Sequence, residues 1–237
     1  MMIMQVSIKG VLKTSMLDYP GRISAVMFLP FCNLRCPFCH NPELITNPDE
    51  LDDIDPEDFI DFLKRRKNWL DGVVITGGEP TMHKGLPELI SRIKKLGYLV
   101  KLDSNGTNPE MLKELLDRKL LDYIAMDFKS SLERYDEVTA VKVDKEKIKK
   151  SVELIKQSGI DHEFRATVLP DFFDTEEAKK ISEWLKGAKR FALQQFKNVD
   201  KVLDPSFQDK ESYTPDELTA FKRIMEPYFD EVEVRGI

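Results

Sequence analysis

The sequence predicts an α/β fold built on a parallel sheet, and three observations support this fold class. Short apolar segments alternate with amphipathic segments of helical length along most of the chain. The connections between them are mostly short, and such an alternation gives parallel strands with right-handed crossovers. The length of 237 residues is normal for one α/β barrel. We therefore expect a single domain over residues 1–237.

Three strands and three helices are expected in the first half of the chain. Apolar runs typical of buried strands lie at residues 23–29, 73–76 and 98–102. Amphipathic stretches predict helices at residues 55–67, 83–96 and 109–118. Asp55 is a suitable N-cap and Pro56 a suitable first helical residue, while Gly97 is typical of a helix end.

The second half continues the alternation. Strands are predicted at residues 121–126, 162–169 and 190–196, helices at residues 144–157, 175–186 and 214–228, and a last extended piece at residues 231–235. Residues 198–213 form the one irregular stretch. Six strand–helix units favour either an open, incomplete barrel or a doubly wound sheet, and periodicity alone does not separate the two.

Composition narrows the function classes. Apolar residues make up 41% of the chain, yet no run approaches the length of a transmembrane helix. Residues 1–9 lack the features of a signal peptide, so we expect a cytoplasmic protein without a membrane partner. The net charge of −6 argues against a broad basic surface and therefore against nucleic acid as a partner.

The chain has three cysteines, and all of them lie in one loop after the first predicted strand, at Cys32, Cys36 and Cys39. An odd, clustered set does not suit a disulfide framework and indicates metal binding. Three thiolates can hold three corners of an iron–sulfur cube and leave the fourth iron open for a ligand. The alternative is zinc bound by the three cysteines and His40, although structural zinc sites usually draw ligands from two separate arms.

Polar loops also follow the next three predicted strands. They begin with Gly77, Asp103 and Asp127. In a parallel α/β barrel the loops after the strands form the ligand-binding face. We therefore expect these loops and the cysteine loop to serve one site.

The spacing C-x3-C-x2-C, with the aromatic Phe38 before the third cysteine, resembles the signature of the radical S-adenosylmethionine superfamily. The resemblance implies an incomplete (β/α)6 TIM-like barrel and one 4Fe-4S cluster on Cys32, Cys36 and Cys39. It further implies that S-adenosylmethionine binds the open iron and is cleaved reductively to methionine and a 5′-deoxyadenosyl radical, which abstracts hydrogen from a substrate. The cofactors carry that chemistry and the protein positions them.

Two of the loops match further motifs of the superfamily. Gly77, Gly78 and Glu79 match its G-G-E motif, which implies backbone and carboxylate contacts to the ammonium of the methionine moiety. Asp103, Ser104 and Asn105 resemble the D-T-N-G loop of glycyl-radical-enzyme activases, with Ser in place of Thr. Asn105 would then help to hold the ribose. Outside the resemblance, this stretch is an ordinary Asn–Gly turn.

Asp127 and Lys129 match the D-x-K motif of the same activases. By this resemblance Lys129 pairs with the methionine carboxylate. Asp103 faces a monovalent cation or the polar end of the cofactor, and Asp127 completes the cation site. Arg165 is implied, more loosely, as a second contact to the cofactor carboxylate. A solvated surface pair is the alternative for Asp127 and Lys129.

His40 and Asn41 extend the third cysteine to C-H-N, as in activating enzymes of pyruvate formate-lyase and anaerobic ribonucleotide reductase. The resemblance implies that Phe38, His40 and Asn41 contact the cofactor. Residues 14–21 resemble a segment that lines the substrate mouth of those enzymes, with Tyr19 where Gly is usual. The chain looks most like the anaerobic ribonucleoside-triphosphate reductase activating proteins.

This resemblance implies a glycyl radical enzyme as protein substrate, anaerobic ribonucleotide reductase first and a pyruvate formate-lyase-like enzyme second. It implies flavodoxin or ferredoxin as electron donor. Two alternatives stay open: a radical enzyme acting on a small molecule or nucleotide, which the Tyr19 departure allows, and a non-enzymatic zinc-binding module.

Overall fold

The computed structural model describes residues 6–197 and 201–237. Two short segments lie outside the described residues, at 1–5 and 198–200. The first belongs to the segment in which no signal peptide is expected, and the second to the irregular stretch. The described strands are β1 Gly10–Ser15, β2 Ser24–Leu29, β3 Gly72–Gly77, β4 Leu99–Ser104, β5 Tyr123–Asp127, β6 Asp161–Val168, β7 Arg190–Gln195 and β8 Glu231–Arg235. Each strand expected from the sequence is present.

The strand order follows the chain order from β1 to β8. β2, β3 and β4 pair in parallel, as do β6, β7 and β8, whereas β1 is antiparallel to β2. A doubly wound sheet reverses its strand order at a switch point, and this order has no reversal. The chain therefore has an α/β fold with an open, mainly parallel sheet, which confirms the barrel-type alternative.

The longer helices fall between the strands as expected: α2 Pro56–Arg65, α3 Leu86–Lys95, α4 Pro109–Asp117, α6 Lys145–Gln157, α7 Thr175–Leu185 and α8 Pro215–Met225. The side chain of Asp55 accepts a hydrogen bond from the Glu57 N–H at 2.8 Å, which confirms the predicted cap. The helix predicted from residue 83 begins later because Pro80–Met82 forms a separate 3-10 turn.

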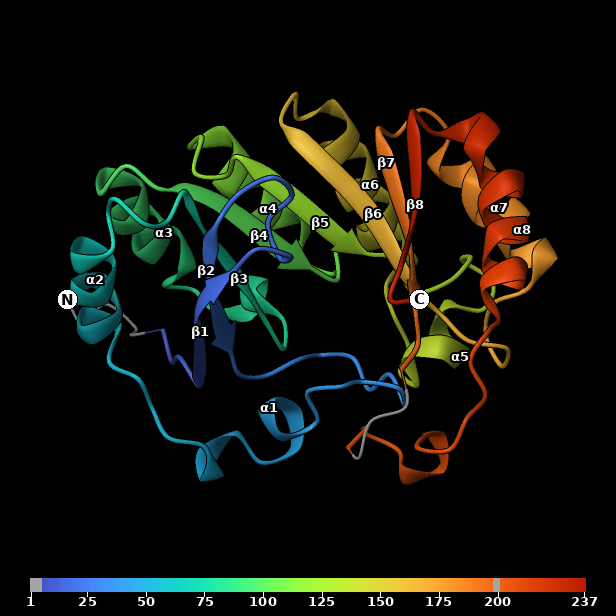
Figure 1. The fold of residues 1–237 in the computed structure, drawn as a ribbon, viewed down its shortest axis with the longest axis horizontal. Helices are drawn as coiled ribbons and strands as arrows, with labels where there is room; N and C mark the ends of the chain where they lie inside the picture. The colour runs from blue at the N-terminus through green and yellow to red at the C-terminus, as the bar shows by residue number, and fades with distance from the viewer. Residues whose placement is uncertain (1–5, 198–200) are drawn as a thin grey trace. The chain divides into compact units, whose positions relative to one another are not determined.

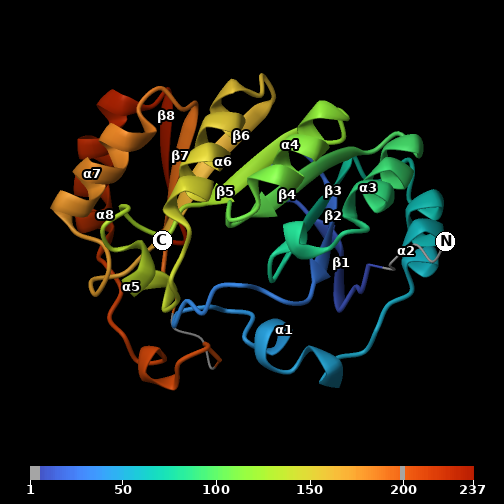
Figure 2. The same cartoon turned by 180° about the vertical axis from the view of Figure 1, so that it is seen from behind.

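The chain divides into two compact units. The first unit contains Met1–Asn33, Glu43–Ser104 and Asn108–Ile124, with strands β1 to β4 and helices α2 to α4. Figure 2 shows α3 and α4 in front of β3 and β4. Val73 and Ile75 of β3 and Ile90 and Ile93 of α3 have no exposed surface. Burial of these aliphatic side chains between helix and sheet stabilises the unit.

The second unit contains Leu34–Pro42, Asn105–Thr107 and Ala125–Ile237. It holds β6 to β8 and helices α6 to α8, together with the short α5 Tyr135–Thr139. Helices α7 and α8 lie side by side next to β7 and β8 (Figure 1). Phe191 and Leu193 of β7 and Leu218 of α8 are fully buried. Helices of this unit therefore cover the apolar side chains of its own strands.

Strand β1 was not expected from the sequence. Its residues are half-buried or exposed except for Ser15, so an edge strand of this kind carries no continuous apolar run. Ser15 pairs with Ser24, the first residue of β2. The segment that follows β1 therefore lies at the amino end of β2.

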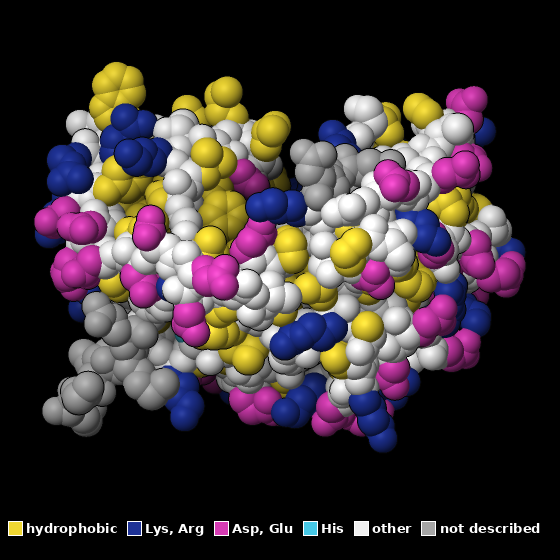
Figure 3. All heavy atoms as spheres, turned by 90° about the horizontal axis from the view of Figure 1, so that it is seen from below, with side chains coloured by type: hydrophobic (Ala, Val, Ile, Leu, Met, Phe, Trp, Pro, Cys, Tyr) yellow, Lys and Arg dark blue, Asp and Glu magenta, His cyan; other side chains and the backbone are white. Residues whose placement is uncertain are grey.

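No helix within the described residues is long and apolar enough to cross a membrane. On the face seen in Figure 3, acidic and basic side chains are interspersed with apolar ones. The single-domain expectation and the absence of nucleic acid and membrane partners stay predictions.

Candidate active site

The start of the cysteine loop and the Gly–Gly loop lie against each other in the first unit. The Gly78 N–H donates to the Leu29 carbonyl at 2.8 Å. A Cβ added to Gly77 would lie 2.3 Å from the Leu29 carbonyl oxygen, and one added to Gly78 would lie 2.0 Å from that of Phe31. Only glycine allows this approach. The two glycines thus bring their loop to the chain immediately before Cys32.

Glu79 is fully buried and joins this loop to the next one. Its Oε1 accepts hydrogen bonds from the Thr81 N–H at 3.0 Å, from the Thr81 hydroxyl, and from the Ser104 hydroxyl at 2.9 Å. The structure therefore places Glu79 and Ser104 together, as the motifs predict. Thr81 was missed by sequence reasoning, although its place two residues after Glu79 is a signal for a side chain–backbone cap.

Asp103 forms an ion pair with Lys101, with 2.6 Å between Oδ1 and Nζ. The two residues are two apart on β4, so their side chains are on the same side of the strand. Both side chains are buried, at 8% and 1% exposure. Sequence reasoning missed Lys101 because a lysine in a strand is usually on the solvent side.

Asn105 shows the turn geometry of an Asn–Gly sequence. Its Oδ1 accepts hydrogen bonds from the Thr107 N–H at 3.0 Å and the Thr107 hydroxyl at 2.7 Å. This oxygen therefore stabilises the local turn. A contact of Asn105 with the ribose stays a prediction.

The other two cysteines belong to the second unit, where the Cys39 N–H donates to the Cys36 carbonyl at 3.0 Å. Cys36 is buried, Cys39 and Cys32 are half-buried, and none of them is in a disulfide. Burial raises the pKa of the Cys36 thiol, and the positive charge of Lys129 opposes this rise. Cys36 is thus within electrostatic reach of the D-x-K motif.

The residues around Cys39 mainly pack against aromatic rings. Phe38 is buried against Phe172, with ring centroids 5.9 Å apart, and His40 stacks on Phe196 at 5.4 Å. Asn41 is half-buried. These contacts fix the cysteine loop, and direct contacts of Phe38, His40 and Asn41 with a cofactor stay predictions.

The D-x-K motif and Arg165 lie together in the second unit. Arg165 donates to Asp127 through Nε at 2.5 Å and through Nη2 at 3.4 Å. The Lys129 ammonium is 3.8 Å from the Asp127 carboxylate. Phe128 points the other way, fully buried, with its ring 4.7 Å from that of Trp184. The buried ring anchors the loop that carries Asp127 and Lys129.

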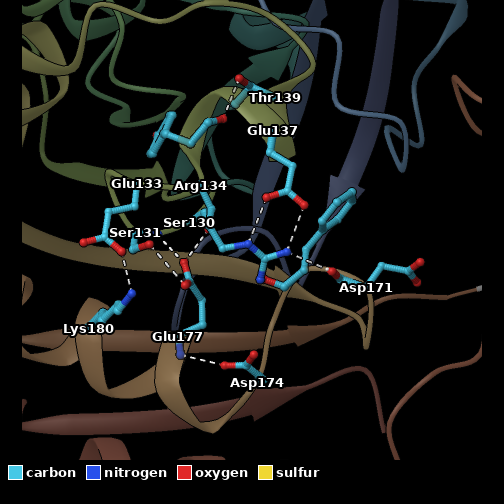
Figure 4. A network of polar contacts seen from close by, with 12 residues as sticks. Ser130, Ser131, Glu133, Arg134, Glu137, Thr139, Asp171, Asp174, Glu177 and Lys180 are labelled. Carbon is cyan, nitrogen blue, oxygen red and sulfur yellow. Dashed lines mark hydrogen bonds and ion pairs between the residues drawn. The ribbon is translucent and has the colours of Figure 1, made fainter.

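Glu177 of α7 holds the residues that directly follow this motif (Figure 4). Its buried carboxylate accepts hydrogen bonds from the Ser130 hydroxyl, from the Ser131 N–H, and from the Ser131 hydroxyl at 3.1 Å. Its own N–H is capped by Asp174 at 2.8 Å. No sequence motif pointed to Glu177.

The same segment reaches the cysteine loop through α5. The Arg35 N–H donates to the Thr139 carbonyl at 2.9 Å. Figure 4 shows Arg134, just before α5, between Glu137 and the chain at Asp171, and its Nη2 donates to the Asp171 carbonyl at 3.0 Å. The cysteine loop, the D-x-K loop and the loop after β6 are therefore tied by direct hydrogen bonds.

Residues 14–21 lie at the other end of β2 from Cys32. They follow β1 at the amino end of β2, whereas Cys32 follows the carboxyl end of β2. Tyr19 is buried there, with its ring 5.8 Å from that of Tyr123 and its Cε1 3.0 Å from a Cβ added to Gly72. The antiparallel pairing of β1 therefore places this segment at the strand ends opposite to those that lead to Cys32. A role of the segment in lining a substrate mouth stays a prediction.

The candidate residues thus form two sets. The first unit brings together Gly77, Gly78, Glu79, Asp103 and Ser104, beside the chain that leads to Cys32. The second unit brings together Cys36, Cys39, Asp127, Lys129 and Arg165. Over residues 6–197 and 201–237 no three His, Cys, Asp or Glu side chains converge in a way that could hold a metal ion. The three unbridged thiols of one loop are nonetheless suitable ligands for three irons of an iron–sulfur cluster.

Comparison with known proteins defines the class of this site. Residues 26–185 match the Radical SAM superfamily. The match covers more than half of the chain and includes the cysteine motif, the G-G-E loop, the D-x-K loop and Arg165. The chain belongs to the radical SAM superfamily, a family of enzymes, and the zinc-module alternative is thereby removed.

Individual relatives extend the match. A protein of Methanocaldococcus jannaschii, provisionally named a glycyl-radical enzyme activating enzyme, is 35% identical over 241 residues, covering 99% of this chain and 98% of the relative. The pyruvate formate-lyase-activating enzyme of Listeria monocytogenes is 33% identical over 122 residues, which are 47% of this chain and 48% of that enzyme.

Solved structures share the fold. Streptococcus suis SuiB bound to S-adenosylmethionine superposes with a TM-score of 0.67 at 16% identity, over 89% of this chain and 52% of SuiB. The chain therefore spans about half the length of SuiB. At this identity the likeness concerns the fold, and it agrees with the incomplete barrel expected from the cysteine motif.

Proposed function

We propose that this protein is an activating enzyme that uses S-adenosylmethionine to install a glycyl radical on a partner enzyme. The observation that carries the proposal is the 35% identity to the M. jannaschii protein over essentially the whole of both chains. The C-H-N extension and the D-x-K loop support it. Anaerobic ribonucleotide reductase is the first candidate partner and a pyruvate formate-lyase-like enzyme the second.

Cys32, Cys36 and Cys39 would hold a 4Fe-4S cluster. The cluster, when bound, supplies the electron that cleaves S-adenosylmethionine. The short hydrogen-bonded turn from Cys36 to Cys39 fixes the spacing of two of these ligands. The burial of Cys36 excludes water from its sulfur.

Residues of each set, taken by itself, suit a different group of S-adenosylmethionine. Backbone groups exposed by Gly77 and Gly78, with the Glu79 carboxylate, suit an ammonium group. Lys129 suits the methionine carboxylate, because an ammonium and a carboxylate form a strong charge-assisted hydrogen bond. Arg165 acts on Asp127 directly, so its role is to hold that carboxylate in place.

A glycine α-hydrogen is a chemically sensible target, since the radical formed is delocalised over the flanking peptide groups. We propose flavodoxin or ferredoxin as the electron donor and the cytoplasm as the compartment. Oxygen would destroy both the radical and a cluster with an open iron, so the activity requires anaerobic conditions.

The deciding experiment mixes the reduced, cluster-loaded protein, S-adenosylmethionine and a candidate partner without oxygen. Electron paramagnetic resonance should show an organic radical on the partner, and chromatography should show 5′-deoxyadenosine formed in step with it. The control is the same mixture with a partner whose radical-site glycine is changed to alanine. Cleavage without a radical on any glycyl radical enzyme of the host would replace activation by the small-molecule alternative.

A further inference from the structure

The resemblance to activases implies a monovalent cation at Asp103 and Asp127, and the structure does not fit it. A cation bound at these two residues would take their carboxylate oxygens as ligands and would offset their negative charge. In this chain each of the two carboxylates already has a basic side chain of its own unit beside it.

The evidence against a bound cation is stronger at Asp103 than at Asp127, because both side chains of the Lys101–Asp103 ion pair are buried. The Lys101 ammonium is 2.6 Å from Asp103 Oδ1, and the two side chains are 1% and 8% exposed. The same ammonium is 5.8 Å from the centroid of the Tyr123 ring, whose face favours a cation. A charge buried to this degree must be paired. Asp103 and Lys101 therefore offset each other's charge.

Asp127 is held by a different cation. Two nitrogens of the Arg165 guanidinium contact its two carboxylate oxygens, at 2.5 and 3.4 Å. A guanidinium cannot lose its charge in a protein and fits a carboxylate through two parallel contacts. The negative charge of Asp127 is thus already offset by Arg165, which a bound cation would otherwise do.

We infer that Lys101 and Arg165 replace the monovalent cation, so that this protein works without a bound alkali metal ion. Lys101 is the built-in counter-ion of Asp103, and Arg165 is that of Asp127. The inference rests on the proposed function only for its activity readout, which is cleavage of S-adenosylmethionine.

The first test compares the cluster-loaded protein in potassium, sodium and choline chloride at one ionic strength. We expect the rate of 5′-deoxyadenosine formation and the midpoint of thermal unfolding to be the same in all three salts. A rate that rises about tenfold with potassium or sodium, the size expected for one charge-assisted contact, would overturn the inference.

The second test removes the counter-ion. In Lys101→Met, the Asp103 charge is left without its ammonium, and potassium or sodium should now raise both the unfolding midpoint and the cleavage rate relative to choline. Lys94→Met is the matched control, since it breaks a Lys–Asp pair of the same 2.6 Å length with Asp122 in the same unit. In the double variant Lys101→Met, Asp103→Asn, the salt dependence should disappear.

The outcomes separate the two hypotheses. A folded Lys101→Met protein that is indifferent to potassium and sodium would overturn the counter-ion role of Lys101. If that variant does not fold, the wild-type comparison decides. Absence of cleavage in every salt would contradict the proposed function, and the unfolding midpoints would still decide whether a cation binds.

Discussion

At the scale of single residues, Lys129 and Arg165 both stand beside Asp127, and their distances separate their roles. Arg165 holds the carboxylate at 2.5 Å, whereas the Lys129 ammonium is 3.8 Å away, beyond hydrogen-bond range. Lys129 also acts electrostatically on Cys36. Lys129 is therefore better placed than Arg165 to pair with the carboxylate of a ligand bound near the cysteine loop.

Lys129→Ala should weaken binding of S-adenosylmethionine without loss of iron. A charge-assisted hydrogen bond contributes about 1.5–3 kcal/mol, or about a ten- to hundredfold change in affinity. The measurement is a dissociation constant on the cluster-loaded protein. Lys149→Ala, which removes an exposed lysine of the same unit, is the control. An unchanged dissociation constant would return Lys129 to the role of a surface charge.

Cys32→Ala, Cys36→Ala and Cys39→Ala should each abolish reductive cleavage of S-adenosylmethionine, because in the proposed cluster each thiolate is the only protein ligand of one iron. Iron content and 5′-deoxyadenosine formation are measured after anaerobic reconstitution. Asn33→Ala, an exposed change within the same loop, should retain both. Cleavage retained by all three cysteine variants would exclude the cluster assignment.

Candidate site residues that belong to a short motif could be predicted from the sequence. The residues that hold them in place could not. Glu79 and Ser104, from two motifs, are hydrogen-bonded as their shared site requires. Lys101 and Glu177 gave no signal, because a charged residue in a strand or in the first turn of a helix is usually solvated. Glu177 is buried by contacts with Ser131, which is 46 residues away along the chain, so no local pattern contains them. Lys101 pairs with Asp103 two residues later on β4, and the local sequence does not show that this pair is buried.

At the scale of elements, helix α7 positions the loop after β5. The Glu177 carboxylate is the acceptor for three donors on Ser130 and Ser131, directly after the D-x-K motif. Arg134 and α5 continue this segment to the cysteine loop. A helix on the outside of the second unit thereby fixes the loop that carries Lys129.

Glu177→Ala should destabilise the protein and loosen this loop. Each buried donor left without an acceptor costs roughly 1–3 kcal/mol. Urea unfolding measures the loss, and the milder Glu177→Gln should raise the dissociation constant for S-adenosylmethionine while the protein stays folded. Glu176→Gln is the matched control, because its side chain is 72% exposed on the same helix turn. Equal behaviour of Glu176→Gln and Glu177→Gln would contradict the positioning role.

The elements that the sequence predicted are those with strong periodicity or capping. The helix predicted from residue 214 is present: Thr214 is its N-cap in a capping box with Glu217, and α8 begins at Pro215. Strand β1 and the short helix α5 were missed. β1 is an edge strand with an exposed, mixed sequence, and α5 has only five residues, too few to show a helical period.

At the scale of the whole molecule, the strand order and strand directions decide at which ends of the strands the functional residues lie. Among β2 to β4, and again among β6 to β8, the strands follow the chain order and pair in parallel. In each of these groups, the loop after one strand therefore lies next to the loop after the following strand. β1 is the exception, since its antiparallel pairing carries Tyr19 to the amino end of β2. The resemblance to other activases did not show at which strand ends this segment lies, and the pairing of β1 does.

The histidines predict how the stability of the whole protein depends on pH. Burial lowers the pKa of His83 and His162 below the ordinary value of 6.5. Below that value the unfolded chain takes up protons that the folded protein does not, so the free energy of unfolding should fall as the pH drops from 6.5 towards the folded pKa values.

Exposed carboxylates such as Glu57, whose pKa is also lowered, lose their contribution to stability only near and below their ordinary value of 4.5. Unfolding midpoints measured anaerobically between about pH 8 and pH 5.5 should therefore be level above the histidine range and decline within it. His162→Gln should flatten the decline. The change removes a buried imidazole, 3% exposed, that takes up a proton more readily in the unfolded chain than in the folded protein. A midpoint that stays constant or rises through this range would contradict the buried, neutral state of these histidines.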